Sequence, residues 1–182
     1  MEFLEVSSKL RDAFLFAYKM HKDQERKFSG RPYIEHPEFV TAFLSQYTDD
    51  EDILTAAMLH DTVEDTEATL EDILELFGDR TASLVGELTC DTTLKKQYGK
   101  RIYMAIHFNE LSSDAFLIKL ADRLHNLIGL DHEEIPIGFV KWYVKETNFV
   151  LDKLDREVTK EQQEIINFMK MMLFNIEFKR KL

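Results

Sequence analysis

Apolar residues recur along most of the chain at the three-to-four-residue spacing of an amphipathic helix. The pattern begins with Phe3, Leu10, Phe14 and the neighbours Ala17 and Tyr18. It continues through residues 37–47, 50–60, 69–80, 81–88, 95–108, 112–130, 136–158 and 160–182. No segment alternates convincingly at the period of two that is typical of a strand. The chain is therefore predicted to fold as an all-α helical bundle.

Polar residues at the ends of these ranges support the predicted helix boundaries. Asp49 and Asp50 precede an apolar run and are suited to cap it. Thr69 followed by Asp72 has the spacing of a capping box, and Gly78 supplies a stop.

One long segment lacks the helical pattern, at residues 21–37 (HKDQERKFSGRPYIEHP). It is rich in Gly, Pro and charge, and a loop on a helical scaffold is where we expect a binding site. Because the sequence has no repeat, low-complexity stretch or linker, we predict a single domain over residues 1–182. Its motif-bearing core would cover about 21–130, with further helices in 136–182.

The amino-acid composition limits the kinds of molecule that the chain is expected to bind. Of the 182 residues, 45% are hydrophobic and 31% are charged, which indicates a globular domain with a sizeable core. The formal net charge of -11 argues against binding to nucleic acid, because that binding requires clustered Lys and Arg. An anionic small ligand would have to be held by a metal ion or by a local basic cluster.

The cysteine count and the amino terminus bear on the cellular compartment. Cys90 is the only cysteine, so an intramolecular disulfide and a thiolate zinc site are both excluded. The first residues are acidic where a signal peptide needs positive charge, and no apolar run approaches the roughly 20 residues of a membrane span. We expect a cytoplasmic protein that does not bind membranes.

The stretch MLHDTVEDT, residues 58–66, gathers titratable side chains at the end of an apolar helix. His60 and Asp61 are adjacent, so they point about 100° apart in a regular helix and can share one ion only where the helix ends or distorts. Glu64 and Asp65 follow about one turn later. Mixed imidazole and carboxylate ligands suit metal-assisted hydrolysis, and nearby carboxylates can orient or deprotonate a water molecule.

Two other segments offer residues that would complete such a site. His36 lies immediately before Pro37, next to a predicted helix. Asp122 lies on a mostly apolar helix, where a carboxylate is costly unless it is paired or bound to metal. Asn126 is four residues further along and therefore shares the face of Asp122.

Each of these residues also has a purely structural interpretation. His60 would then be a satisfied helix-end histidine, and Asp61 to Asp65 would be acidic residues near a helix start. His36 would be a turn residue before proline, and Asp122 would pair with Arg123 or with a lysine elsewhere. Taken singly, each structural interpretation is favoured, but the combination favours a metal site.

Five stretches together resemble the HD-domain metal-dependent phosphohydrolases, and within them the alarmone hydrolase domain of the Rel/Spo enzymes. These stretches are HKDQERK, PYIEHP, AAMLHDTVEDT, FGDRTASLVGELT and IKLADRLHNL, and they span roughly residues 21–130. The doublet HD alone is weak evidence, whereas the combination is specific. The chain is too short for the synthetase and regulatory domains of the long enzymes, so it resembles a small, hydrolase-only member.

The resemblance implies an all-helical HD-domain fold that removes pyrophosphate from the 3′ position of ppGpp or pppGpp. Glu64 and Asp65 match the pair that handles the attacking water. Arg26 and Lys27 match a basic pair beside the base and phosphates of the guanine nucleotide, and Asn126 matches a ribose or phosphate contact. One Mn²⁺ ion would be held by His36, His60, Asp61 and Asp122.

Three positions depart from the family pattern. Phe28 intervenes between the basic pair and SG, Asp23 stands where glycine is usual, and Ile128 replaces a common basic residue. These changes leave the metal and water residues in place but alter the substrate wall. We therefore keep a second hypothesis, an HD phosphohydrolase for another nucleotide, and a third, a non-catalytic HD module that binds an alarmone or a partner.

The carboxyl-terminal region allows further interpretations. Lys141 and Lys145 share a helical face, and Trp142 or Tyr143 would be able to stack on a base, although an aromatic core stripe is the favoured interpretation. The Met and Phe residues of 166–178 indicate core or a subunit contact. If they stay exposed after folding, they would mark a homo-oligomer interface.

Overall fold

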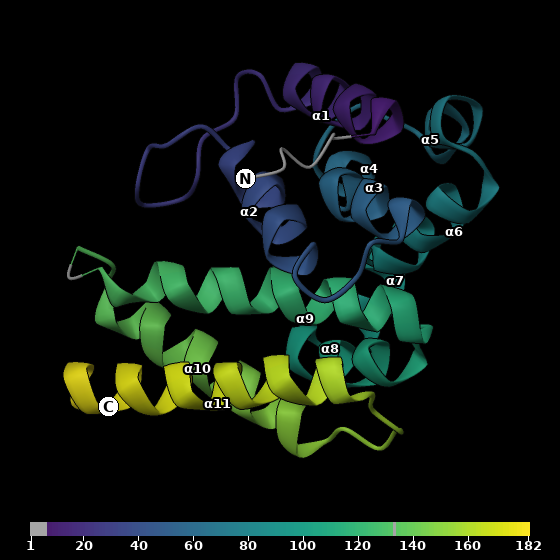
Figure 1. Cartoon of the computed structure of the whole chain (residues 1–182). Helices are drawn as coiled ribbons and strands as arrows, with labels where there is room; N and C mark the ends of the chain where they lie inside the picture. The colour runs from purple at the N-terminus through teal and green to yellow at the C-terminus, as the bar shows by residue number, and fades with distance from the viewer. Residues whose placement is uncertain (1–6, 133) are drawn as a thin grey trace. The chain divides into compact units, whose positions relative to one another are not determined.

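The computed structural model describes residues 7–132 and 134–182 (Figure 1). Within those residues the regular secondary structure is helical, and the one β feature is an isolated bridge between Glu25 and Pro32. The all-α prediction is confirmed. The chain forms two compact units, Met1–Thr89 and Cys90–Leu182, which are described in turn. The single domain predicted for residues 1–182 stays a prediction.

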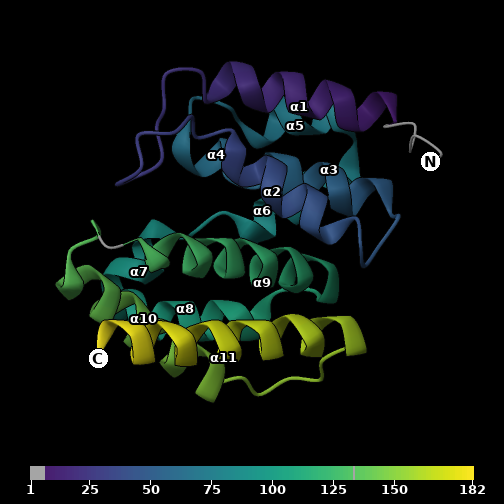
Figure 2. The ribbon, with the colours of Figure 1, turned by 60° about the vertical axis from the view of Figure 1, so that its left-hand side comes forward.

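The first unit is organised around a short apolar helix. It contains α1 (Ser8–Met20), α2 (Glu35–Leu44), α3 (Glu51–Leu59), α4 (Thr62–Asp65), α5 (Leu70–Phe77) and α6 (Asp79–Leu88). Helix α3 packs against α1, α2 and α6, and Figure 2 shows α1 running above α2 and α3. Every residue of α3 from Thr55 to Leu59 is buried. The carboxyl end of α3 is therefore held inside the unit.

The ends of α3 and α5 follow the sequence prediction. Asp50 caps α3 by accepting hydrogen bonds from the amides of Asp52 and Ile53. Thr69 and Asp72 form the predicted capping box of α5. Gly78 separates α5 from α6 with φ of 88°, a left-handed conformation that glycine adopts without strain.

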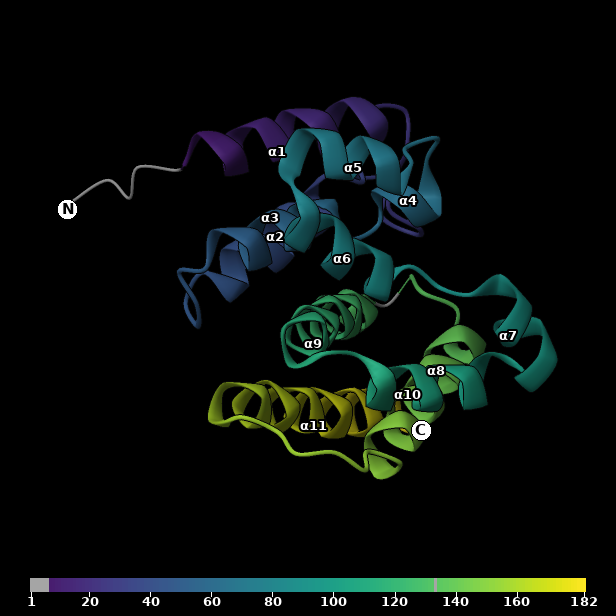
Figure 3. The ribbon, with the colours of Figure 1, turned by 90° about the vertical axis from the view of Figure 1, so that its right-hand side faces the viewer.

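The second unit is organised around a longer buried helix. It contains α7 (Thr92–Tyr98), α8 (Lys100–Glu110), α9 (Ser113–Ile128), the 3₁₀ turn η1 (Gly129–Asp131), α10 (Ile137–Asp152) and α11 (Lys160–Arg180). Helix α9 packs against α11, which lies beneath it in Figure 3, and α10 packs against α8 and α11. Arg123 of α9 donates a hydrogen bond of 2.9 Å to Oε1 of Glu146 on α10, and both side chains are buried.

Several helix boundaries differ from the sequence expectation, and two of the differences are the largest. The segment 95–108 divides between α7 and α8, because Gly99 takes φ of 77° and ends the first helix. Helix α10 ends at Asp152, before the predicted 158. Beyond it the Asn109 side chain donates to the carbonyl of Lys153 and accepts from the amide of Asp155, so a contact distant in sequence replaces helical hydrogen bonds.

The expected helix start around Phe3 lies outside the described residues. Over residues 7–132 and 134–182, no helix has both the length and the apolar character that crossing a membrane requires.

Replacing Asp50 with alanine should destabilise the first unit. The Asp50 carboxylate caps α3 and accepts from Nη1 of Arg80 on α6 at 2.7 Å, so the loss should be about 1 to 2 kcal/mol at neutral pH. Burial raises the pKa of Asp50, but Arg80 and the amides of Ile53 and Asp52 lower it overall. Its contribution is therefore present above the unfolded pKa of about 3.9 and is lost as pH falls through the lower folded pKa.

Urea unfolding of the wild-type and Asp50→Ala proteins at pH 7 and at about pH 3 would measure this effect. The difference between the two proteins should shrink at the lower pH. The control is Asp49→Ala, which removes an exposed acidic residue next to the cap. Equal losses for the two variants would contradict the assignment of Asp50 as the cap.

Candidate functional site

His60 lies where α3 ends, and its ring is held in one orientation. The carbonyl of Ala57 lies 2.8 Å from Nδ1 of His60, so that nitrogen carries the proton and Nε2 is left as a possible ligand atom. Nε2 lies 3.0 Å from Oδ2 of Asp61. Because α3 ends at Leu59 and α4 begins at Thr62, the chain turns between the two helices. This turn brings the side chains of His60 and Asp61 close together.

His36 reaches the same carboxylate from a second helix. It is the second residue of α2 and is buried, and its Nε2 lies 3.5 Å from Oδ2 of Asp61. The rings of His36 and His60 have centroids 5.1 Å apart, with 67° between their planes. Their ligand nitrogens lie within 4.8 Å of each other. Two imidazoles and a carboxylate form a donor set that suits a divalent transition-metal ion.

Tyr33 links the loop before α2 to the two carboxylates after α3. Its hydroxyl donates a hydrogen bond to Oδ2 of Asp61 at 2.6 Å and lies 3.3 Å from Oδ2 of Asp65. The Tyr33 ring lies against the buried ring of His21, with centroids 4.7 Å apart and 30° between the ring planes. His21 in turn binds Gln24, whose amide donates to the backbone carbonyl of Asp65. The loop is therefore attached to the acidic stretch at two points.

The acidic pair lies on α4, beside the two histidines. Glu64 and Asp65 are both exposed. The pKa of Asp65 is raised, first by the partial loss of hydration of its carboxyl group and then by the charges of Asp61 and Glu64, while the Tyr33 hydroxyl opposes the shift. Asp65 therefore shares the Tyr33 hydroxyl with Asp61, and Glu64 lies next to Asp65 on α4.

The predicted basic pair lies on the loop that Tyr33 attaches. This loop is closed by hydrogen bonds from the amide of Arg26 to the carbonyl of Arg31 and from Gly30 back to Arg26. The Arg26 guanidinium lies 5.7 Å from the centroid of the Tyr33 ring. Lys27 lies 5.1 Å from the ring centroid of Phe28, which is exposed and has φ of 75°. The inserted aromatic therefore takes a conformation that is strained for any residue except glycine.

In the second unit, Asp122 is buried on α9 between two polar neighbours. Nζ of Lys119 lies 3.0 Å from its Oδ2, and the Asn126 side chain donates to its Oδ1 at 2.7 Å. The predicted shared face of Asp122 and Asn126 is confirmed. The pairing of Asp122 with a lysine is also present, whereas Arg123 pairs with Glu146. Lys119 balances the charge that burial of Asp122 would otherwise leave uncompensated.

Of the two aromatic residues singled out on α10, Tyr143 is buried and Trp142 is exposed. Tyr143 is buried beneath the Arg123 guanidinium, 4.1 Å from its ring centroid, and burial raises its pKa to about 12. It is therefore part of the core, as the favoured interpretation holds, while Lys141 and Lys145 are exposed. Tyr33 and Gln24 were not singled out from the sequence, although Tyr33 stands within the motif PYIEHP.

Comparison with known proteins agrees with this geometry. The model of the HD domain family matches residues 13–136, which is more than half of the chain. The chain belongs to the HD-domain family. The match includes His36, the His60 and Asp61 doublet, and Asp122, so all four predicted ligands lie inside the family region.

Relatives of this HD domain carry names that specify an activity. The human guanosine-3′,5′-bis(diphosphate) 3′-pyrophosphohydrolase MESH1 is 42% identical over 143 residues, which cover 77% of this chain and 79% of that protein. The probable pyrophosphohydrolase of the same name from Synechocystis is 41% identical over 129 residues, but the match spans only 16% of its length. A solved structure, described as a metazoan orthologue of SpoT that hydrolyses ppGpp, superimposes with a TM-score of 0.80 at 32% identity and covers 98% of both chains.

Replacing Tyr33 with phenylalanine should weaken metal binding without unfolding the first unit. The substitution removes only the hydroxyl that orients Asp61, and loss of such a supporting hydrogen bond typically lowers metal affinity by about tenfold or more. Isothermal titration of Mn²⁺ into each purified protein would measure the affinity. The control is Tyr18→Phe on the exposed side of α1. Equal affinity in Tyr33→Phe and wild type would show that Tyr33 does not support the site.

Proposed function

We propose that this chain is a metal-dependent hydrolase that removes pyrophosphate from the 3′ position of ppGpp or pppGpp, giving GDP or GTP. The observation that carries the proposal is the approach of His36 and His60 to one oxygen of Asp61 in the first unit. Family membership and the activity named for MESH1, with which the chain shares 42% identity, support the substrate class.

The proposed metal centre uses four side chains. His36, His60 and Asp61 supply the donors of the first unit, and Asp122 supplies the fourth from the second. The donor set fits a divalent ion, because the Ala57 carbonyl fixes the His60 tautomer and leaves Nε2 available. We propose Mn²⁺ as the ion. When bound, a divalent ion polarises a phosphoryl oxygen and lowers the pKa of a coordinated water.

The proposed reaction is the hydrolysis of one phosphorus–oxygen bond by one water molecule. The water oxygen forms a bond to the phosphorus attached to the ribose 3′ oxygen, and the bond from that phosphorus to the 3′ oxygen breaks. Glu64 or Asp65 takes the proton that the water loses, and the 3′ oxygen takes a proton from that carboxyl group or from solvent as it leaves. Pyrophosphate and a 3′-hydroxyl nucleotide are the products. The Tyr33 hydroxyl holds the carboxylates of Asp61 and Asp65 in fixed positions during this step.

The proposed substrate contacts are cationic and polar. Arg26 and Lys27 lie on the closed loop and offset the charge of the polyphosphate, which a chain with net charge -11 would otherwise repel. The planar guanidinium of Arg26 is also suited to stacking on a purine. Asn126 would contact the ribose or a phosphate.

Incubation of the purified chain with Mn²⁺ and ppGpp, pppGpp or a panel of other nucleotides tests the proposal. Release of pyrophosphate together with GDP or GTP is the expected result. Release of phosphate from another nucleotide would instead support a different HD phosphohydrolase. Absence of turnover despite bound metal would support a binding module.

Two substitutions should separate metal binding from proton handling. Asp61→Ala should abolish both Mn²⁺ binding and turnover, because it removes the carboxylate shared by the two histidines. Glu64→Gln should leave Mn²⁺ binding unchanged while turnover falls by about 100-fold, since only proton transfer is lost. Titration calorimetry and pyrophosphate release measure the two properties.

The matched control for Glu64→Gln is Glu67→Gln, an exposed acidic residue just beyond α4, which should retain full turnover. Full activity of Asp61→Ala would overturn the proposed centre. Full activity of Glu64→Gln would overturn the role given to that carboxylate alone.

Replacing Phe28 with glycine should separate stability from substrate binding. Glycine relieves the strain at φ of 75°, so the unfolding free energy should change by less than about 1 kcal/mol. If Phe28 stacks on the base, KM for ppGpp should rise by about tenfold, because one base–aromatic contact is worth about 1 to 3 kcal/mol. Phe28→Tyr should preserve KM. An unchanged KM in Phe28→Gly would show that the insertion does not contact substrate.

A further inference from the structure

Helix α11 carries apolar residues on two opposite faces. One face packs into the second unit through Ile165, Ile166, Met169, Leu173 and Ile176, all of which are buried. The other face carries Phe168, Met171, Phe174 and Phe178, which are 44%, 51%, 67% and 77% exposed. A helix on the surface of a globular protein normally presents polar residues there. Exposed aromatic residues at successive turns mark an interaction surface.

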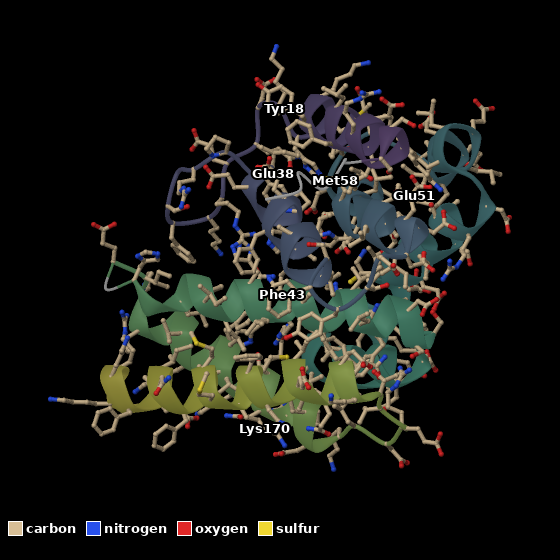
Figure 4. All side chains as sticks on the ribbon, in the orientation of Figure 1. Tyr18, Glu38, Phe43, Glu51, Met58 and Lys170 are labelled. Carbon is tan, nitrogen blue, oxygen red and sulfur yellow. The ribbon has the colours of Figure 1, made fainter. Side chains whose placement is uncertain are left out.

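The exposed residues form a continuous seam along α11. Phe168, Met171, Asn175 and Phe178 follow one another at spacings of three and four residues, which is the pattern of one helix packed against another. Lys170, beside this seam, projects from α11 on the side away from α9 (Figure 4). Asn175 lies within the seam, where a single polar residue favours one register.

The charges at the two ends of α11 are opposite in sign. Its first turns carry Lys160, Glu161 and Glu164, with a net negative charge, and its carboxyl end carries Glu177, Lys179, Arg180 and Lys181, with a net positive charge. Glu161 and Lys179 are eighteen positions apart, which is five turns at about 3.6 residues each, so they lie on the same side of the helix. The midpoint between them is residue 170, next to Met171 at the centre of the apolar seam.

We propose that the exposed face of α11 binds the same face of a second copy of this chain, with the two helices antiparallel about a twofold axis near Met171. In that arrangement Glu161 of each copy faces Lys179 of the other, the two apolar seams lie against each other, and the helix dipoles oppose each other. A twofold contact requires one surface that is complementary to itself, and the distribution of charge and apolar residues meets this requirement.

The area of the exposed face of α11 limits the expected affinity of the dimer. A helix of 21 residues is about 31 Å long, and one face of it buries less than the roughly 800 Å² per partner of a standard interface. We therefore expect a reversible dimer with a dissociation constant on the order of micromolar, weakened by salt.

Sedimentation velocity of the full chain from about 1 to about 100 micromolar tests the proposal. Wild type should shift from monomer to dimer across this range. Phe174→Asp and Met171→Asp should both remain monomeric with unchanged circular dichroism, whereas Leu76→Asp, at an apolar residue of α5 that is 60% exposed, should dimerise like wild type. A wild-type chain that stays monomeric throughout would overturn the proposal, as would dimers unaffected by both α11 substitutions.

Charge reversal tests the antiparallel arrangement. Glu161→Lys and Lys179→Glu should each raise the dissociation constant by about threefold to tenfold, because like charges then face each other twice. An equimolar mixture of these two variants should dimerise like wild type, since both facing pairs are again opposite in sign. Lys145→Glu, at an exposed position of α10, is the control for net charge. A mixture as weak as its components would contradict the antiparallel pairing.

Discussion

The first unit depends on the approach of two buried histidines to one carboxylate. His36 and His60 come from different helices, and Asp61 Oδ2 lies 3.5 and 3.0 Å from their Nε2 atoms. Bringing these groups together without compensation is costly, because each must give up water. The packing of α2 on α3 and the hydrogen bond from His60 to the Ala57 carbonyl keep the arrangement in place. The core of this unit thereby orients the ligand atoms.

The same carboxylate connects the metal donors to the loop that precedes α2. Tyr33 donates to Asp61, lies against His21 and lies beneath Arg26, while Gln24 holds the backbone of Asp65. Tyr33 and Gln24 thus connect three residues with proposed roles: Arg26 as the base contact, Asp61 as a metal ligand and Asp65 as the acid that handles water. In the proposed function, this arrangement lets an acidic chain present Arg26 and Lys27 to a polyanionic substrate close to its carboxylates.

The sequence predicted those features that depend on local spacing. The capping box at Thr69 and Asp72 and the shared face of Asp122 and Asn126 follow from helix geometry, and both are present. The motif resemblance indicated the HD domain, which the family match confirms. Contacts between distant segments were not predictable in this way. The end of α10 depends on Asn109, and the contact of Tyr33 depends on a hydroxyl that reaches Asp61, a residue far away in the sequence. The break at Gly99 was missed because the apolar pattern continues through it.

The central proposal is that one divalent ion is held by His36, His60, Asp61 and Asp122. X-ray diffraction from crystals of the Mn²⁺-loaded chain, with data collected on both sides of the manganese absorption edge, tests it most directly. We predict one anomalous peak bonded to these four side chains at roughly 2.0 to 2.3 Å. A manganese peak away from His60 and Asp61, or one without Asp122 among its ligands, would contradict the account.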